Sequence, residues 1–196
     1  MYMSIYDYNL LNIKSQGISM ISNLKKLIAI AVLSACFVVL SIFGTINLYG
    51  LKITSQNLPL YVGAISFGMI PGALIGLLGM LTSQMVTYGF TGTTLFWVLP
   101  YVIIGAIVGE VFEKGIVKEK SKVRFYAFII FMQLLLTLLN TAAMVADSIV
   151  YGYYNLYLIF GSLLVRVIVS VITGIIYATV LPVIIKSIKK YVDLMK

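Results

Sequence analysis

One uncharged stretch constrains this chain more than any other feature, because no Asp, Glu, Lys or Arg lies between Ile53 and Gly109. Those 57 residues would form about 85 Å of helix at about 1.5 Å per residue, whereas the hydrocarbon core of a bilayer is about 30 Å thick. Charged residues make up 10% of the chain, compared with about 25% in an ordinary soluble domain. We therefore expect an all-α integral membrane protein with several crossings.

Apolar runs separated by polar or glycine-rich turns predict six spans. They cover about residues 27–46, 57–70, 72–88, 94–112, 123–146 and 158–185, within a membrane domain of residues 25–190. Residues 1–24 are expected to form an N-terminal tail or interfacial segment, and residues 191–196 a C-terminal tail. The run at 57–70 has 14 residues, which is short for a crossing that usually needs about 20.

The positions of the basic residues decide how the run at 57–70 is interpreted. If it crosses the membrane, twelve basic residues lie on one side: Lys14, Lys25, Lys26, Lys114, Lys118, Lys120, Lys122, Arg124, Lys186, Lys189, Lys190 and Lys196. If it does not cross, the middle cluster lies opposite the N-terminus, against the tendency of Lys and Arg to remain in the cytoplasm. We therefore predict a six-transmembrane-helix bundle with both termini cytoplasmic. The net charge of +8 then reflects loops flanking the spans, and no nucleic-acid partner is expected.

Polar residues within these spans are expected to meet at one depth near the outer face. Arg166 is interpreted first as functional, because a charged side chain inside a span is costly. Alternating helix directions bring polar groups of several other spans to the same level. The candidate substrate-binding residues are Gln56, Asn57, Tyr61, Gln84, Tyr88, Trp97, Tyr101, Asn140, Thr141, Asp147 and Arg166.

These residues also have structural explanations. Trp and Tyr gather at membrane interfaces, and Asn and Gln hydrogen-bond between helices; for Tyr153, Tyr154 and Tyr157 the interfacial explanation is favoured. Arg166 could instead pair with Asp147 or extend toward the outer interface, and both this role and a ligand contact stay open. A guanidinium suits a carboxylate, and aromatic side chains suit a flat ring.

Small residues recur at four-residue spacing, which lets helices approach closely. They are Ala31 and Ala35 in the first span, Gly68, Gly72 and Gly76 around the third, and Gly105 and Gly109 in the fourth. The glycines predict packing within the chain. The alanine pair is equally consistent with a docking surface for another subunit.

The chain has few of the residues that enzymes use for catalysis. The chain has no His, one cysteine (Cys36) and six carboxylates, of which only Asp147 falls near the outer polar cluster. No GxxxxGK[ST] phosphate loop is present, so ATP binding of that kind is excluded. We expect no catalytic residues, no metal site and no cofactor.

Taken together, these motifs resemble the substrate-binding S components of energy-coupling factor (ECF) transporters. The resemblance covers roughly residues 24–190 and rests on four features. They are Ala31-Val32-Leu33-Ser34-Ala35 as an AxxxA motif, the string Leu58-Pro59-Leu60-Tyr61-Val62-Gly63-Ala64-Ile65-Ser66-Phe67-Gly68, the glycines after Pro71, and Asn140-Thr141 followed by Arg166.

The resemblance implies a prokaryotic plasma-membrane subunit that binds a vitamin or related micronutrient in an outward-facing pocket. It would dock through Ala31 and Ala35 on a transmembrane T subunit driven by two cytoplasmic ATPases, and topple to release its ligand. Residues 47–57 and 90–93 would be lids. Arg166 and the aromatics make a folate-like solute the first guess; pantothenate, riboflavin and pyrimidine or deazaguanine precursors stay open. The rival classes are a stand-alone small transporter and a structural membrane subunit without a ligand.

Overall fold

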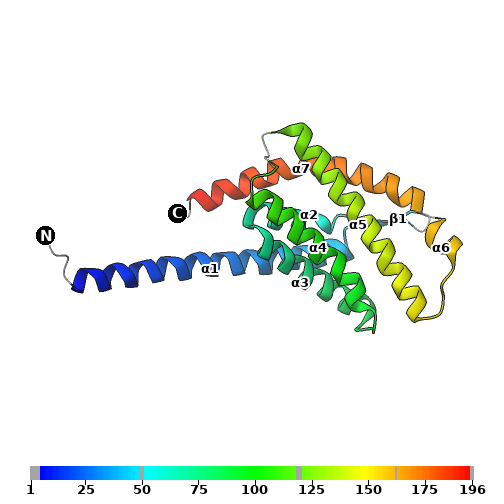
Figure 1. The fold of residues 1–196 in the computed structure, drawn as a ribbon, viewed down its shortest axis with the longest axis horizontal. Helices are drawn as coiled ribbons and strands as arrows, with labels where there is room; N and C mark the ends of the chain where they lie inside the picture. The colour runs from blue at the N-terminus through cyan, green and yellow to red at the C-terminus, as the bar shows by residue number, and fades with distance from the viewer. Residues whose placement is uncertain (1–4, 49–50, 118–120, 162, 195–196) are drawn as a thin grey trace.

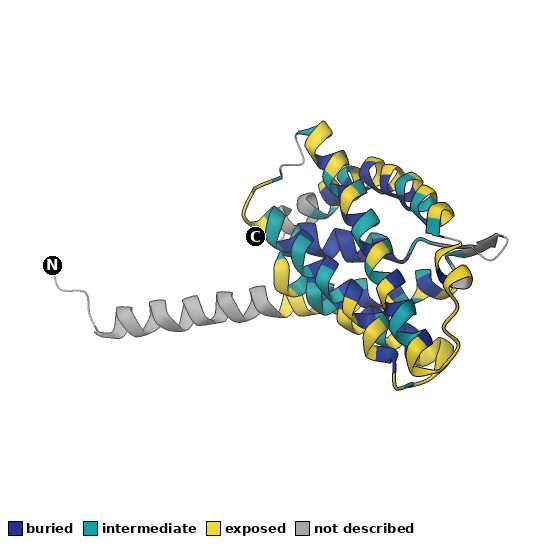
Figure 2. Cartoon of the chain, turned by 45° about the vertical axis from the view of Figure 1, so that its right-hand side comes forward, coloured by how far each residue is buried: buried dark blue, intermediate teal, exposed yellow. Residues whose placement is uncertain are grey.

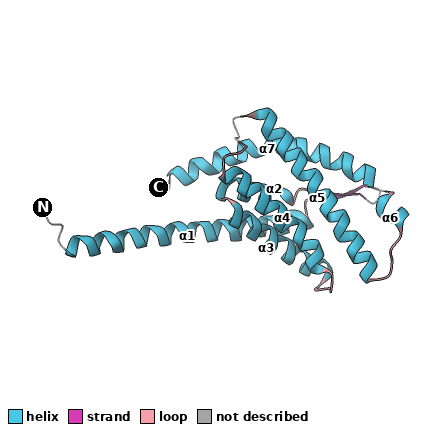
Figure 3. Cartoon of the chain, viewed as in Figure 1, coloured by secondary structure: helices cyan, strands magenta, loops and turns pink. Residues whose placement is uncertain are grey.

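The computed structural model describes residues 5–48, 51–117, 121–161 and 163–194, and places side chains over most of residues 24–188. Helices dominate this part of the chain (Figures 1 and 3). The elements are α1 (Ile5–Ile42), β1 (Thr45–Leu48), β2 (Leu51–Thr54), α2 (Asn57–Phe67), α3 (Met69–Tyr88), α4 (Thr94–Glu113), α5 (Lys122–Val150), α6 (Leu156–Phe160) and α7 (Leu163–Leu194).

Five of the described helices are long and apolar enough to cross a membrane. The candidate spans are Leu24–Ile42, Met69–Tyr88, Thr94–Glu113, Lys122–Val150 and Leu163–Ile188. This confirms a mainly helical, multi-pass membrane protein. Helix α2 is also apolar but has only 11 residues, or about 16 Å at the usual rise, so it is too short to span the hydrocarbon core by itself.

Element bounds differ from the expected ones in the hairpin region, in the last span and at both ends of the chain. The expected loop at 47–56 contains an antiparallel hairpin, in which Ile46 lies opposite Ile53 and Asn47 opposite Lys52. The strands Thr45–Leu48 and Leu51–Thr54 alternate polar and apolar residues, which is the period of a strand. The expected span at 158–185 is divided into α6 and α7, with Gly161 at the end of α6. At both ends of the chain, helix extends into the expected tails.

Helix α2 lies at the centre of the bundle. It packs against α1, α3, α4 and α7, and Leu60, Tyr61 and Ala64 have no exposed surface. In Figure 2 the buried residues concentrate along α2 and on the facing sides of its neighbours, whereas the outward sides of the long helices are exposed. Those outward sides carry apolar residues such as Leu99 and Val183, as expected where a helix faces lipid.

Glycines bring α3 and α4 into backbone contact. A Cβ added to Gly72 would lie 2.4 Å from the carbonyl oxygen of Gly105, and one added to Gly76 would lie 2.5 Å from that of Tyr101. A Cβ on Gly109 would lie 2.5 Å from the backbone of Gly68. The prediction that these glycines serve packing within the chain is confirmed.

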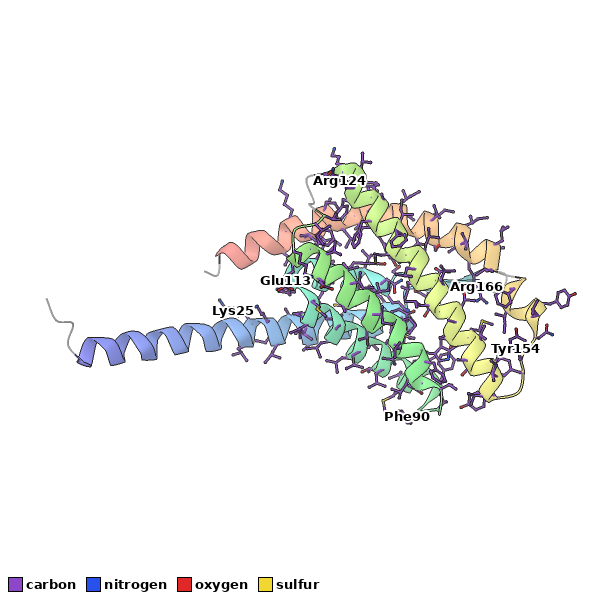
Figure 4. All side chains as sticks on the ribbon, in the orientation of Figure 1. Lys25, Phe90, Glu113, Arg124, Tyr154 and Arg166 are labelled. Atoms are coloured by element: carbon purple, nitrogen blue, oxygen red, sulfur yellow. The ribbon has the colours of Figure 1, made fainter. Side chains whose placement is uncertain are left out.

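The bundle has two distinct ends (Figure 4). Lys25, Glu113 and Arg124 lie toward one end, on the side where α1 begins and α7 ends. Phe90, Tyr154 and Arg166 lie toward the other. We call these the Glu113 end and the Arg166 end. At the Glu113 end, the backbone N–H of Met69 donates to Glu113 Oε2 at 3.2 Å, which ties the start of α3 to the end of α4.

Candidate ligand-binding site

A cavity of about 620 Å³ opens among α3, α4, α5, α7 and the segment that joins α1 to α2. Ligand pockets in proteins usually measure about 300–1,000 Å³. Its lining comprises ten Ser or Thr residues, five Asn or Gln residues, four aromatic residues, four aliphatic ones and two charged ones, Asp147 and Arg166. A polar interior inside an apolar exterior indicates a place for a polar solute.

Ten of the eleven residues predicted to contact substrate line this cavity: Gln56, Asn57, Gln84, Tyr88, Trp97, Tyr101, Asn140, Thr141, Asp147 and Arg166. The helices thus bring these residues together. Tyr61 is the exception, because its side chain is fully buried in the core. Its hydroxyl donates to Gln133 Oε1 at 3.0 Å, and its ring makes an edge contact with Tyr177. Tyr61 therefore holds the cavity residue Gln133 in place from within the core.

Two linked groups of amide and hydroxyl side chains form the inner part of the cavity. Gln56 Nε2 donates to the Tyr101 hydroxyl at 2.7 Å, and Asn140 Nδ2 lies 3.4 Å from the same oxygen. Asn57 Nδ2 lies 3.5 Å from Gln133 Oε1, the oxygen that Tyr61 also contacts. These bonds connect α2, α4 and α5. They hold the side chains in fixed directions before any solute arrives.

The two charged residues of the cavity, Asp147 and Arg166, differ in the strength of their hydrogen-bond partners within the chain. The hydroxyls of Thr93 and Tyr153 both donate to the Asp147 carboxylate. Tyr153 lies in the loop after α5, and donating this hydrogen bond raises the pKa of its hydroxyl to about 12, with further contributions from desolvation and from the negative charge of Asp147. The carboxylate thus already has strong partners within the chain.

Arg166 has a much weaker partner. One of its guanidinium nitrogens, Nη1, lies 3.3 Å from the sulfur of Met144, and a thioether is a poor acceptor. Arg166 and Asp147, both within the described part of the chain, form no ion pair with each other. A guanidinium carries five N–H donors, so with respect to the described residues Arg166 retains most of its capacity to bind an anion.

Sequence reasoning missed Gln133 and most of the hydroxyl residues in the cavity. Gln133 stands seven residues before Asn140, so both lie on the same face of α5, and that spacing was an available signal. Ser41 and Ser83, which hydrogen-bond to each other between α1 and α3, gave no such signal. Isolated serines in apolar helices are common, and their direction depends on packing.

The alanine pair of α1 lies away from the cavity. Ala31, Ala35 and Cys36 are exposed, and Val32 between them is 55% exposed. The opposite face of this helix is buried at Ile30, Ser34 and Phe37. This part of α1 therefore presents small apolar side chains outward.

The fold and the cavity define a class: a multi-pass membrane protein that encloses a polar, ligand-sized site within its helices. The family model described as ECF transporter, substrate-specific component, matches residues 25–185. The chain belongs to this family and is therefore a substrate-binding subunit of a transporter, not an enzyme. Membership implies a small-molecule substrate, with a T subunit and ATPases as partners. No curated protein matches the chain.

Proposed function

We propose that this S component captures a vitamin or related micronutrient, with a folate-like compound first, in the cavity at the outer face of the membrane. The observation that carries the proposal is the free donor capacity of Arg166 in a cavity of about 620 Å³. A fork of N–H groups suits a carboxylate. Trp97, Tyr88 and Tyr151 line the same cavity and offer faces on which a flat ring can stack.

The other micronutrients that the family resemblance left open match these features less completely. Pantothenate carries a carboxylate but no flat ring. Riboflavin carries a flat ring but no acidic group to meet Arg166. A nucleobase precursor is flat but would fill little of a cavity of about 620 Å³. A folate-like compound has both an acidic end and a ring system.

The proposal includes six crossings with both termini in the cytoplasm. In support, α2 begins beside the cavity at Asn57 and ends at Phe67. The next residue is Gly68, and a Cβ added there would lie 2.7 Å from Glu113 Oε2. Helix α2 thus runs between the two ends of the bundle, and the hairpin before it completes the path. Lys25 and Arg124 both lie toward the Glu113 end (Figure 4), where the cytoplasm would be.

For delivery, we propose docking of the exposed alanine pair of α1 on the T subunit. The bound S component would then topple in the membrane while two ATPases drive the cycle. Close helix contact requires small residues, and Ala31 and Ala35 are exposed. Residues 47–57, residues 90–93 and the loop near Asp147–Tyr154 would close the cavity during this step.

The first test is to identify the solute. We expect native mass spectrometry of gently purified protein to show a bound species whose mass, after release, corresponds to a folate-like compound. Added solute should raise the thermal unfolding midpoint, because a ligand that binds only the folded state stabilises it. A protein that shows neither a bound species nor a shift with any vitamin tested would be a structural subunit. Uptake into liposomes without ATPases would indicate a stand-alone transporter.

The second test addresses docking. Ala31→Trp is expected to abolish solute uptake in cells that supply the T subunit and ATPases, because the indole blocks close approach of the helices. Solute binding by the purified variant should match the wild type. Val32→Trp is the matched control, since Val32 is also exposed but is turned about 100° around the helix. Normal uptake by Ala31→Trp would rule out this docking surface.

A further inference from the structure

Two asparagine side chains of the cavity have buried oxygens that could accept hydrogen bonds from a solute. Resting on the proposed function and deepening it, we propose that Asn57 Oδ1 and Asn140 Oδ1 select a solute whose ring carries N–H or amino donors, while Arg166 holds the acidic end of the same solute. The two asparagines would be specificity-determining residues. The solute class is an elongated anion with a donor-rich heterocycle.

Two orphaned oxygens are the first observation. Within the described residues, four buried side-chain atoms lack a hydrogen-bond partner: Ser34 Oγ, Asn57 Oδ1, Ser66 Oγ and Asn140 Oδ1. Both asparagines line the cavity, whereas Ser34 and Ser66 do not. Asn57 is only 5% exposed, so water reaches it poorly. Leaving such an atom unpaired is costly, and a donor on the solute would remove that cost.

The orientation of these amides follows from their neighbours. The Tyr61 hydroxyl donates to Gln133 Oε1, and the Asn57 group facing that oxygen is therefore its NH₂, at 3.5 Å. The Asn140 NH₂ faces the Tyr101 hydroxyl, which also accepts from Gln56 Nε2. Each asparagine uses its donor group within the protein, and its oxygen is left for the cavity.

Hydroxyl groups extend the same pattern. Thr137, Thr141, Ser170 and Thr173 line the cavity, and each donates its hydroxyl hydrogen to a carbonyl three or four residues earlier in its own helix. A hydroxyl has one donor and two acceptor lone pairs. With the donor used, these four residues present only lone pairs to a solute. Six cavity side chains on α2, α5 and α7 thus act as acceptors.

We call these six side chains the acceptor wall: Asn57, Thr137, Asn140, Thr141, Ser170 and Thr173. Arg166 is separated from the acceptor wall along the helix axes. Its contact Met144 lies four residues beyond Asn140 on α5, or about 6 Å at the helical rise. On α7, Ser170 and Thr173 lie four and seven residues further from the Arg166 end, or about 6 and 10 Å. The cationic donor Arg166 therefore stands at one end of the cavity, and these acceptors lie deeper. An elongated solute would enter with its ring first and keep its acidic group at Arg166.

The test compares two solutes that differ by one donor group. Folic acid and its 2-desamino analogue, in which hydrogen replaces the ring amino group, would be titrated into purified full-length protein. Trp97 is the only tryptophan in the chain and lines the cavity, so its fluorescence reports occupancy, and calorimetry provides a second reading. We expect the wild type to prefer folic acid by at least about tenfold, because the analogue leaves an acceptor unpaired.

The variants assign that preference to the asparagines. In the double variant Asn57→Leu with Asn140→Leu, the preference should fall to less than about threefold, since the acceptors are gone. Asn140→Asp keeps the acceptor oxygens and should retain the preference, so it gives a reading if the double variant does not fold. Ser66→Ala is the control, because it removes an unpaired buried polar atom outside the cavity. An undiminished preference in the double variant, or its loss in Asn140→Asp, would overturn the inference.

The experiment also distinguishes a wrong solute from a wrong role of the asparagines. If wild-type protein binds riboflavin or pantothenate and not folic acid, the folate-like proposal is wrong. The acceptor wall is then judged with the solute that binds. Affinity lowered at least tenfold in Asn57→Leu or Asn140→Leu supports it, and unchanged affinity in both overturns it. If none of the three binds, both proposals fall.

Discussion

Two helix pairs of this protein, α3 with α4 and α5 with α7, differ in how closely their backbones approach. Along α3 and α4, glycines place the backbones in direct contact, with Gly72 against Gly105 and Gly76 against Tyr101. Along α5 and α7, one close approach occurs where a Cβ on Gly174 would lie 3.0 Å from the Cα of Ile130. Toward the Arg166 end the long side chains of Met144 and Arg166 stand between the helices. The helices of the first pair leave no space between them, whereas those of the second pair separate toward the Arg166 end and leave room for part of the cavity.

The difference separates stability from binding. Without water to drive apolar groups together, helices in a bilayer associate through close packing, and α3 with α4 supplies much of it. The α5–α7 side gives up contact in order to present polar groups to a solute. Substitutions in the two regions should therefore fail different assays.

Arg166→Ala should affect binding alone. We expect its affinity for folic acid to fall about 10- to 150-fold, since a hydrogen bond involving a charged group contributes about 1.5–3 kcal/mol. Its thermal unfolding midpoint without solute should stay near that of the wild type, because the Arg166 hydrogen bond seen among the described residues goes to the weak acceptor Met144. Arg124→Ala, at the exposed start of α5, is the control. Equal affinities in calorimetry for wild type and Arg166→Ala would remove Arg166 from the site.

Gly72→Ala should affect stability first. The added methyl would lie 2.4 Å from the carbonyl oxygen of Gly105, so α3 and α4 must separate, at a cost of about 1–3 kcal/mol. Thermal unfolding in detergent measures this effect. Gly92→Ala is the matched control, because the nearest atom to its added Cβ is 4.0 Å away. If both variants melt together, the α3–α4 contact does not limit stability.

Tyr153→Phe tests the rim of the cavity through pH. The hydroxyl that Asp147 accepts has its pKa raised from about 10 to about 12. Its stabilising contribution is therefore complete below pH 10 and is lost as pH rises through 12. Tyr153 is 47% exposed, so solvent screening keeps the effect below about 1 kcal/mol.

The measurement for this third variant is the unfolding midpoint at pH 8 and at pH 11. Wild type should lose more stability than Tyr153→Phe over this interval. Tyr154→Phe is the control, since Tyr154 is similarly exposed at 48%. A wild-type loss no larger than that of Tyr153→Phe would mean that this bond does not stabilise the rim.

Much of this arrangement could be predicted because helix direction alone determines depth. Once the spans alternate, Gln84, Trp97, Asn140 and Arg166 must lie at similar levels, and the cavity contains all four. Glycine packing was equally accessible, because the four-residue spacing that places Gly72 and Gly76 on one face also places them against α4.

Other features depend on information that an apolar run does not contain. Helices that are apolar all round give little indication of which side faces inward, so the positions of Ser83, Thr137 and Thr173 in the cavity were not predictable. The placement of Tyr61 in the core instead of the cavity has the same cause. The hairpin at 45–54 has the alternating residues of strands, but strands of four residues are too short for that alternation to distinguish them from a loop.

The brevity of α2 has a consequence for how a solute descends. A two-stranded ribbon leaves about half of its backbone N–H and C=O groups without partners in the ribbon, and hydrocarbon supplies none. In the present fold one such carbonyl, that of Thr54, is capped by the hydroxyl of Tyr177 at 2.9 Å, deep beside the start of α2. Edge groups of the ribbon that have no protein partner need water, so a solute that entered beside the hairpin would follow a hydrated path. A solute following this path would exchange its hydration shell gradually, and its desolvation cost would be spread along the descent instead of forming one barrier.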